Sequence, residues 1–204
     1  MSATATKKQI GLWEIAGVVF IVVAGGPMHE LFTQSGYWRP LALLAPVNES
    51  IWEHQKMNFW PGLLFAGIQY ACTGKRIPNY WSGKLTGLVV TPVLAVLTFL
   101  VYIEIEQASA ELAPNLLVTS LLSVLSVCIG QAACYRVLTA GHISAFLRRI
   151  TPAVYLLLTV AFSTLSYFPP KIYLFEHQHH YVPVGQYGID VDPEVGPHPW
   201  EVPD

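Results

Sequence analysis

The sequence predicts an all-α integral membrane protein with about five transmembrane helices, an N-terminus inside and a C-terminal tail outside. Hydrophobic residues make up 53% of the chain and charged residues 12%, about half of the roughly 25% that an average soluble domain carries. The apolar residues form long runs. Most basic residues lie before the first run or in every second connection between the runs. The 204 residues and the net charge of −2 indicate one domain without a nucleic-acid partner.

Each of the five predicted spans supplies the roughly 20 predominantly apolar residues that a helix needs to cross a bilayer core. The first begins after two lysines, and the second begins amphipathically near Asn48 before it becomes fully apolar. The fifth ends at Pro169 and Pro170, through which a helix cannot continue. The spans cover residues 10–32, 48–74, 81–106, 112–138 and 150–168, so residues 1–168 form the transmembrane bundle.

The distribution of basic residues orients the spans. With the N-terminus inside, eight of the eleven Lys and Arg residues lie on the inner side, where such residues are enriched. Twelve of the thirteen acidic residues then lie outside, with Glu14 as the exception. The residues Val22-Val23-Ala24 also resemble a signal-peptide cleavage site, and cleavage there would leave four spans in the same orientation.

Residues 169–204 form an outer-side tail that differs from the bundle in composition. The tail contains seven prolines and four histidines but few aliphatic residues. Such a segment buries too little apolar surface to fold alone. We therefore expect it either to lie across the outer face of the bundle or to extend from it, and Tyr173 and Phe175 favour docking of its first half.

The densest group of reactive side chains lies at residues 48–54, where the second predicted span begins. Glu49 and Glu53 are four residues apart and therefore share a helix face, with His54 on the neighbouring face. Carboxylates beside an imidazole can bind a divalent metal or carry out general acid–base chemistry, so these three residues are the candidate catalytic residues. The structural alternative is a capping box formed by Ser50 and Glu53.

Other histidines lie on the same predicted side. His29 follows a Gly25-Gly26-Pro27 stretch that weakens or bends the first span, and three more histidines lie near the start of the tail. Imidazole nitrogen and carboxylate oxygen suit zinc or another divalent ion. The candidate metal ligands are His29, Glu49, His54, His177, His179 and His180.

The stretch Asn-Glu-Ser-Ile-Trp-Glu-His at 48–54 resembles the N-E-S-[IV]-W-E-H motif of a family of prokaryotic polytopic membrane proteins of unknown function. Tyr167-Phe168-Pro169-Pro170 resembles the paired-proline motif that follows the last span of that family. The family pattern has a His after the paired prolines, where this chain has Lys171, so a tail histidine would have to replace it. The resemblance implies a multi-pass protein of a prokaryotic cell (plasma) membrane and implicates its outer face. It implies no activity.

Three functions remain open at this stage. A membrane enzyme or metal-binding protein would use the His- and Glu-rich site at the outer membrane face. A non-catalytic accessory or scaffold subunit is favoured by the small size and proline-rich tail, and its partner would be another membrane protein or a second copy of the chain, within the lipid bilayer. A transporter is the least favoured, because none of the spans clearly places a charged residue at mid-membrane and five spans do not divide into equal repeats.

Overall fold

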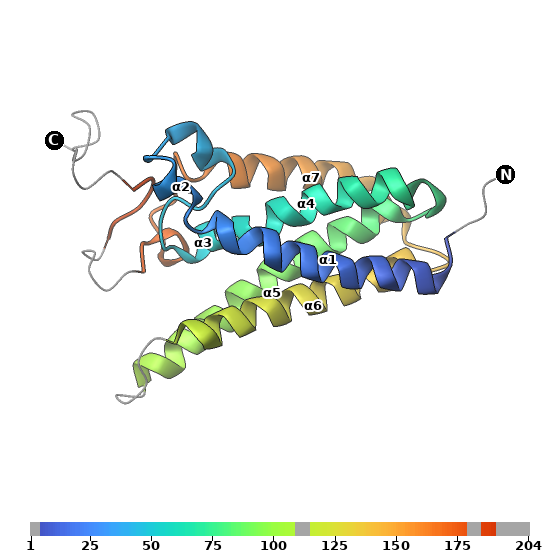
Figure 1. Cartoon of the computed structure of the whole chain (residues 1–204), viewed down its shortest axis with the longest axis horizontal. Helices are drawn as coiled ribbons and strands as arrows, with labels where there is room; N and C mark the ends of the chain where they lie inside the picture. Colours follow the sequence, from blue (N-terminus) through green and yellow to red (C-terminus); the bar gives the residue numbers. More distant parts are fainter. Residues whose placement is uncertain (1–4, 109–114, 179–184, 191–204) are drawn as a thin grey trace.

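The computed structural model describes residues 5–108, 115–178 and 185–190, and this part of the chain forms a bundle of long helices (Figure 1). This part of the chain also contains two short α-helices, three turns of 3₁₀-helix and one isolated β-bridge, between Glu176 and Tyr187. The long helices are α1 (Lys7–Met28), α4 (Lys56–Cys72), α5 (Tyr80–Ala108), α6 (Leu116–Leu138) and α7 (Ala145–Thr164). The short elements are α2 (Leu31–Gln34), α3 (Ile51–His54), η1 (Arg39–Leu43), η2 (Gly74–Arg76) and η3 (Tyr173–Phe175).

Four of the helices in the described part of the chain are long and apolar enough to cross a membrane, namely α1, α5, α6 and α7. The predicted all-α membrane class is therefore confirmed. The second predicted span divides at Gln55 into α3 and α4. Helix α4 has 17 residues, at the lower end of the roughly 17–25 residues that a span needs. The count of five spans and the orientation stay predictions.

Local capping decides where several helices begin. Thr6 and Gln9 form a capping box, so α1 begins at Lys7 rather than at residue 10. The Ser144 hydroxyl accepts a hydrogen bond from the Leu147 N–H, so α7 begins at Ala145, five residues before the predicted start. These capping residues are polar and lie outside the apolar runs, so the helices begin earlier than the apolar runs predict.

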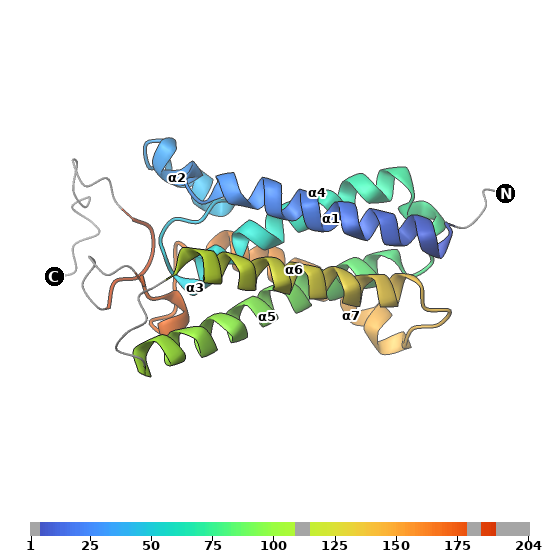
Figure 2. The ribbon, with the colours of Figure 1, turned by 60° about the horizontal axis from the view of Figure 1, so that its bottom comes forward.

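The long helices lie roughly along one axis, and α2, α3, η1 and η3 gather at one end, whereas η2 lies at the other end, near the start of α1 (Figures 1 and 2). Helices α5 and α6 form an antiparallel pair in close contact at Gly130, where an added Cβ would collide with Thr91. In Figure 1 this pair diverges from α1 toward the end that carries α2 and α3. That end of the bundle is therefore the place where loop residues from different helices meet.

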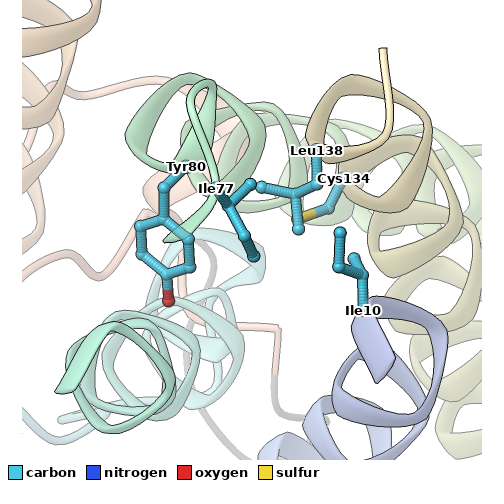
Figure 3. Packing of buried hydrophobic residues seen from close by; sticks show 5 residues of the cluster. All are labelled: Ile10, Ile77, Tyr80, Cys134 and Leu138. Carbon is cyan, nitrogen blue, oxygen red and sulfur yellow. The ribbon is translucent and has the colours of Figure 1, made fainter. Parts of the chain in front are cut away.

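Apolar packing closes the opposite end, near the start of α1. Ile10 from α1 faces Cys134 and Leu138 from α6, beside Ile77 and Tyr80 (Figure 3). The outward faces of the spans carry large exposed apolar side chains, as expected for surfaces in contact with lipid. The start of the tail docks on the bundle, where Phe175 is buried and stacks on Trp52 of α3.

Candidate functional site

The site begins where α1 passes close to α4. A Cβ added at Gly25 would collide with the carbonyl oxygen of Met57, so glycine is required for this close approach of the two helices. The approach places His29, directly after α1, beside His54 at the end of α3, with ring centroids 5.2 Å apart. Two residues that are 25 positions apart in the sequence are thereby brought into contact.

Three ligand atoms form an almost equilateral triangle at this end of the bundle. The Nε2 atoms of His29 and His54 are 3.3 Å apart. Each of them lies 3.4 Å from Oε2 of Glu49. The three side chains are only partly exposed, and this group has the residue types and spacing to hold a metal ion. The structure thus brings together three of the predicted metal ligands.

Both imidazoles use their other ring nitrogen for a hydrogen bond. His29 Nδ1 lies 2.9 Å from Oε1 of Glu30, and His54 Nδ1 lies 2.8 Å from the carbonyl oxygen of Ser50. Both partners are acceptors, so each Nδ1 carries the proton and donates it. In the neutral ring, Nε2 then presents its lone pair to the centre of the triangle. Each ring is therefore held in the tautomer that a metal ligand requires.

The charges in the triangle are strongly coupled. The side-chain hydrogen bond to Glu49 raises the pKa of His29 to about 9, although burial opposes the rise. The same hydrogen bond lowers the pKa of Glu49 to about 2. The two residues therefore form an imidazolium–carboxylate pair at neutral pH when no cation is bound. A metal ion entering the site would replace the proton on His29.

Glu53 does not join these residues. Helix α3 begins at Ile51, so Glu49 precedes the N-cap residue Ser50 and lies outside the helix, and the shared helix face expected for Glu49 and Glu53 does not form. Glu53 is buried, and its carboxylate pairs with Lys56 at 2.9 Å. The structure thus places this predicted catalytic residue in an ion pair away from the two imidazoles.

The capping-box alternative is half realised. The Ser50 hydroxyl accepts a hydrogen bond from the Glu53 N–H at 3.2 Å, which caps α3. The return bond is absent, because the Ser50 N–H donates to Oδ1 of Asn48 at 2.8 Å. The Asn48 amide also donates to the carbonyl oxygen of Gly188, so this residue fixes the loop that carries Glu49 against the tail.

Of the predicted tail ligands, His177 lies within the described residues, and it takes another position. His177 is largely buried, and its Nε2 lies 3.2 Å from Oδ2 of Asp190. It is not part of the three-residue group with ligand spacing. His179 and His180 lie outside the described residues. The tail instead contributes packing, since Phe175 stacks on Trp52 of α3 with ring centroids 4.8 Å apart.

A second polar cluster, inside the bundle, was not predicted. Lys84 lies within α5, and its Nζ contacts both carboxylate oxygens of Glu14 at 2.8 Å. Gln69 donates to the same carboxylate at 3.0 Å, and all three side chains are buried. The available signal was Glu14 itself, because an acid within an apolar span requires a buried partner.

Comparison with known proteins places the chain in a family but gives it no activity. No curated protein and no solved structure matches the sequence. One family model, described as a family of unknown function (DUF6512), matches residues 1–189, which include the whole triangle of ligand atoms. Because this match covers most of the chain, the protein belongs to the DUF6512 family of unknown function.

Proposed function

We propose that this protein binds a divalent metal ion of the zinc type through His29, Glu49 and His54. The observation that carries the proposal is the triangle of ligand atoms, with edges of 3.3, 3.4 and 3.4 Å. Zinc holds nitrogen and oxygen ligands at about 2.0–2.1 Å, and in a tetrahedron such ligands are about 3.3–3.4 Å apart. The side chains are therefore spaced as three corners of a zinc tetrahedron.

The surroundings of the triangle support the same proposal. Histidines that ligate a metal almost always donate their other ring N–H to a carboxylate or a backbone carbonyl. His29 has a carboxylate partner in Glu30, and His54 has a carbonyl partner in Ser50. Two histidines that only pack against each other would not require an Nδ1 hydrogen bond on each ring. They would also not require a carboxylate such as Glu49 between their Nε2 atoms.

The ligand set favours a catalytic role over a structural one. Structural zinc sites are closed by four protein ligands, whereas a His₂Glu set leaves the fourth position open for water or substrate. A zinc ion in such a site lowers the pKa of bound water to about 7 and polarises carbonyl oxygens. We therefore propose a metal-dependent membrane enzyme, with hydrolysis as its reaction class, whose site faces the outer side of the membrane.

Metal content tests the proposal directly. The full chain, purified in detergent with a tag that lacks histidine, is expected to carry about one zinc-type ion per molecule, because one site among the described residues has the required ligand set. The His54→Ala variant should lose the ion while keeping its thermal unfolding midpoint in the metal-free form. His142→Ala removes an exposed histidine outside the site and should leave the metal content unchanged.

Two results would refute the metal site. One is equal metal content in the wild type and in the His54→Ala variant. The other is the absence of metal from the wild type even after dialysis against zinc. Either result would favour the accessory-subunit alternative, and copurification from the native membrane would then be the next measurement.

The hydrogen bond from His29 to Glu30 provides a second prediction. Loss of such an outer partner typically weakens metal binding by 10- to 100-fold, and the exposed position of Glu30 favours about tenfold for Glu30→Ala. Glu30→Gln keeps an acceptor oxygen and should have a smaller effect. Chelator competition measures both affinities, and wild-type affinity in both variants would show that Glu30 does not position the ring.

A further inference from the structure

A cavity of about 250 Å³ adjoins the proposed metal centre. His29 and His54 form part of its wall, whereas Glu49 does not, so the cavity lies on the imidazole side of the triangle. It extends along α1 to Ile21, eight residues before His29, which corresponds to about 12 Å of helix. The cavity therefore extends from the metal centre along α1, a helix that is long and apolar enough to span a membrane.

The wall of the cavity is mixed in polarity near the imidazoles and mainly apolar farther along this path. Near the imidazoles it includes Asn58 from α4 and Ser120 from the first turns of α6. Farther along, it includes Val22 from α1 and Val124 from α6. Helices α1 and α6 run antiparallel, so the end of α1 and the start of α6 lie at the same end of the bundle (Figure 2). The polar residues Asn58 and Ser120 thus lie in the part of the wall nearer the metal centre, and the deeper part is mainly apolar.

The cavity also reaches the surface of the bundle. Leu116 lines it and is 82% exposed, and Val22 lines it and is 38% exposed. Gly26 lines it too, and an added Cβ at this position would meet no atom within 4 Å. The exposed part of the wall therefore lies on α1 and α6, two helices that are long and apolar enough to cross a membrane.

We propose that this cavity binds the acyl chain of a lipid, with the chain in the apolar part and a carbonyl or carboxyl oxygen at the open position of the metal. This inference rests on the metal centre proposed above and names the class of substrate for it. A water-soluble substrate would gain nothing from the apolar depth or from the exposed part of the wall on α1 and α6. An acyl lipid matches both ends of the cavity and this exposed part of its wall.

The test uses the cobalt-loaded full chain in lipid nanodiscs and two metal-binding probes, acetohydroxamate and octanohydroxamate. Binding is followed by the visible absorption of the cobalt ion, which requires no enzymatic activity. Burial of the longer chain should make octanohydroxamate bind at least about tenfold more tightly, since each buried methylene contributes about 0.8 kcal/mol. Acetohydroxamate measures the metal centre alone.

Variants separate binding in the cavity from partition into the bilayer. Ser123→Trp fills the cavity from α6 and should abolish the preference for the longer probe while keeping the cobalt spectrum and the acetohydroxamate affinity. Val22→Phe narrows the cavity from α1 and should reduce the preference in the same way. Leu125→Trp places the same ring on an exposed face of α6 and should keep the preference.

The outcomes distinguish the two proposals. Equal affinity for the two probes, or a preference that persists in both Ser123→Trp and Val22→Phe, would overturn the lipid inference and leave the metal centre in place. A wild-type chain that takes up no cobalt and no zinc would refute the metal centre, and the lipid inference with it.

Discussion

Replacement of Lys56 with methionine is expected to lower the free energy of unfolding by about 3–5 kcal/mol, the usual effect of removing one partner from a buried ion pair. Lys56 is fully buried, and its Nζ contacts Glu53 at 2.9 Å and also donates to the carbonyl oxygens of Ala42 and Ala45. Methionine fills a similar volume but leaves the Glu53 carboxylate without its cation. The loss therefore reflects an uncompensated buried charge rather than a cavity.

This network also fixes the segment that carries the metal ligands. The Ser166 hydroxyl, just after α7, donates to Oε1 of Glu53 at 2.6 Å, and the Val47 N–H donates to Oε2 at 3.2 Å. The loop before α3, the start of α4 and the end of α7 are thus joined around one ion pair. We expect Lys56→Met to weaken zinc binding as well, because Glu49 and His54 lie in the segment that the network holds.

Denaturation by SDS in mixed micelles, followed by tryptophan fluorescence, measures the change in stability. Lys171→Met removes an exposed lysine near the same end of the bundle and serves as the matched control. The double variant with Glu53→Gln and Lys56→Met removes the buried charge and should recover part of the stability. A loss for Lys56→Met no larger than that for Lys171→Met would show that the pair contributes little.

Much of the helical architecture could be predicted from the sequence, because a span depends on local composition. The apolar runs gave the long helices, while polar caps such as Ser144 shifted their ends by several residues. The candidate ligands His29, Glu49 and His54 could also be named from residue type and predicted side. Their convergence could not, since it depends on the order in which the helices pack and on the close approach at Gly25.

The roles of the buried charges could not be predicted from the sequence for a related reason. The four-residue spacing of Glu49 and Glu53 indicates a shared face only if both lie in one helix, and Ser50 begins the helix between them. Lys56 and Lys84 each pair with an acid inside the protein, although a count of basic residues treats every lysine as a charge at a membrane face. Composition shows that a lysine is near a span, and only packing shows whether it faces water.

The ion pair between Lys84 and Glu14 should show the second large effect. Lys84→Met leaves the buried Glu14 carboxylate without its cation, although Gln69 still donates a hydrogen bond to it, so we expect a loss of about 3–5 kcal/mol in the free energy of unfolding. Lys75→Met removes an exposed lysine from the nearby loop and should change stability by less than about 0.5 kcal/mol.

The double variant with Glu14→Leu and Lys84→Met tests whether the ion pair is structural or is coupled to the metal site. Well-packed apolar residues often replace a buried ion pair with no loss of stability, so the double variant should recover most of what Lys84→Met loses. The pair lies in a different part of the bundle from the metal ligands, so zinc binding should stay at the wild-type level, as chelator competition can show. Recovered stability with intact zinc binding would identify the pair as a structural link between α1 and α5. Recovered stability with lost zinc binding would instead show that the charges within the spans are coupled to the site.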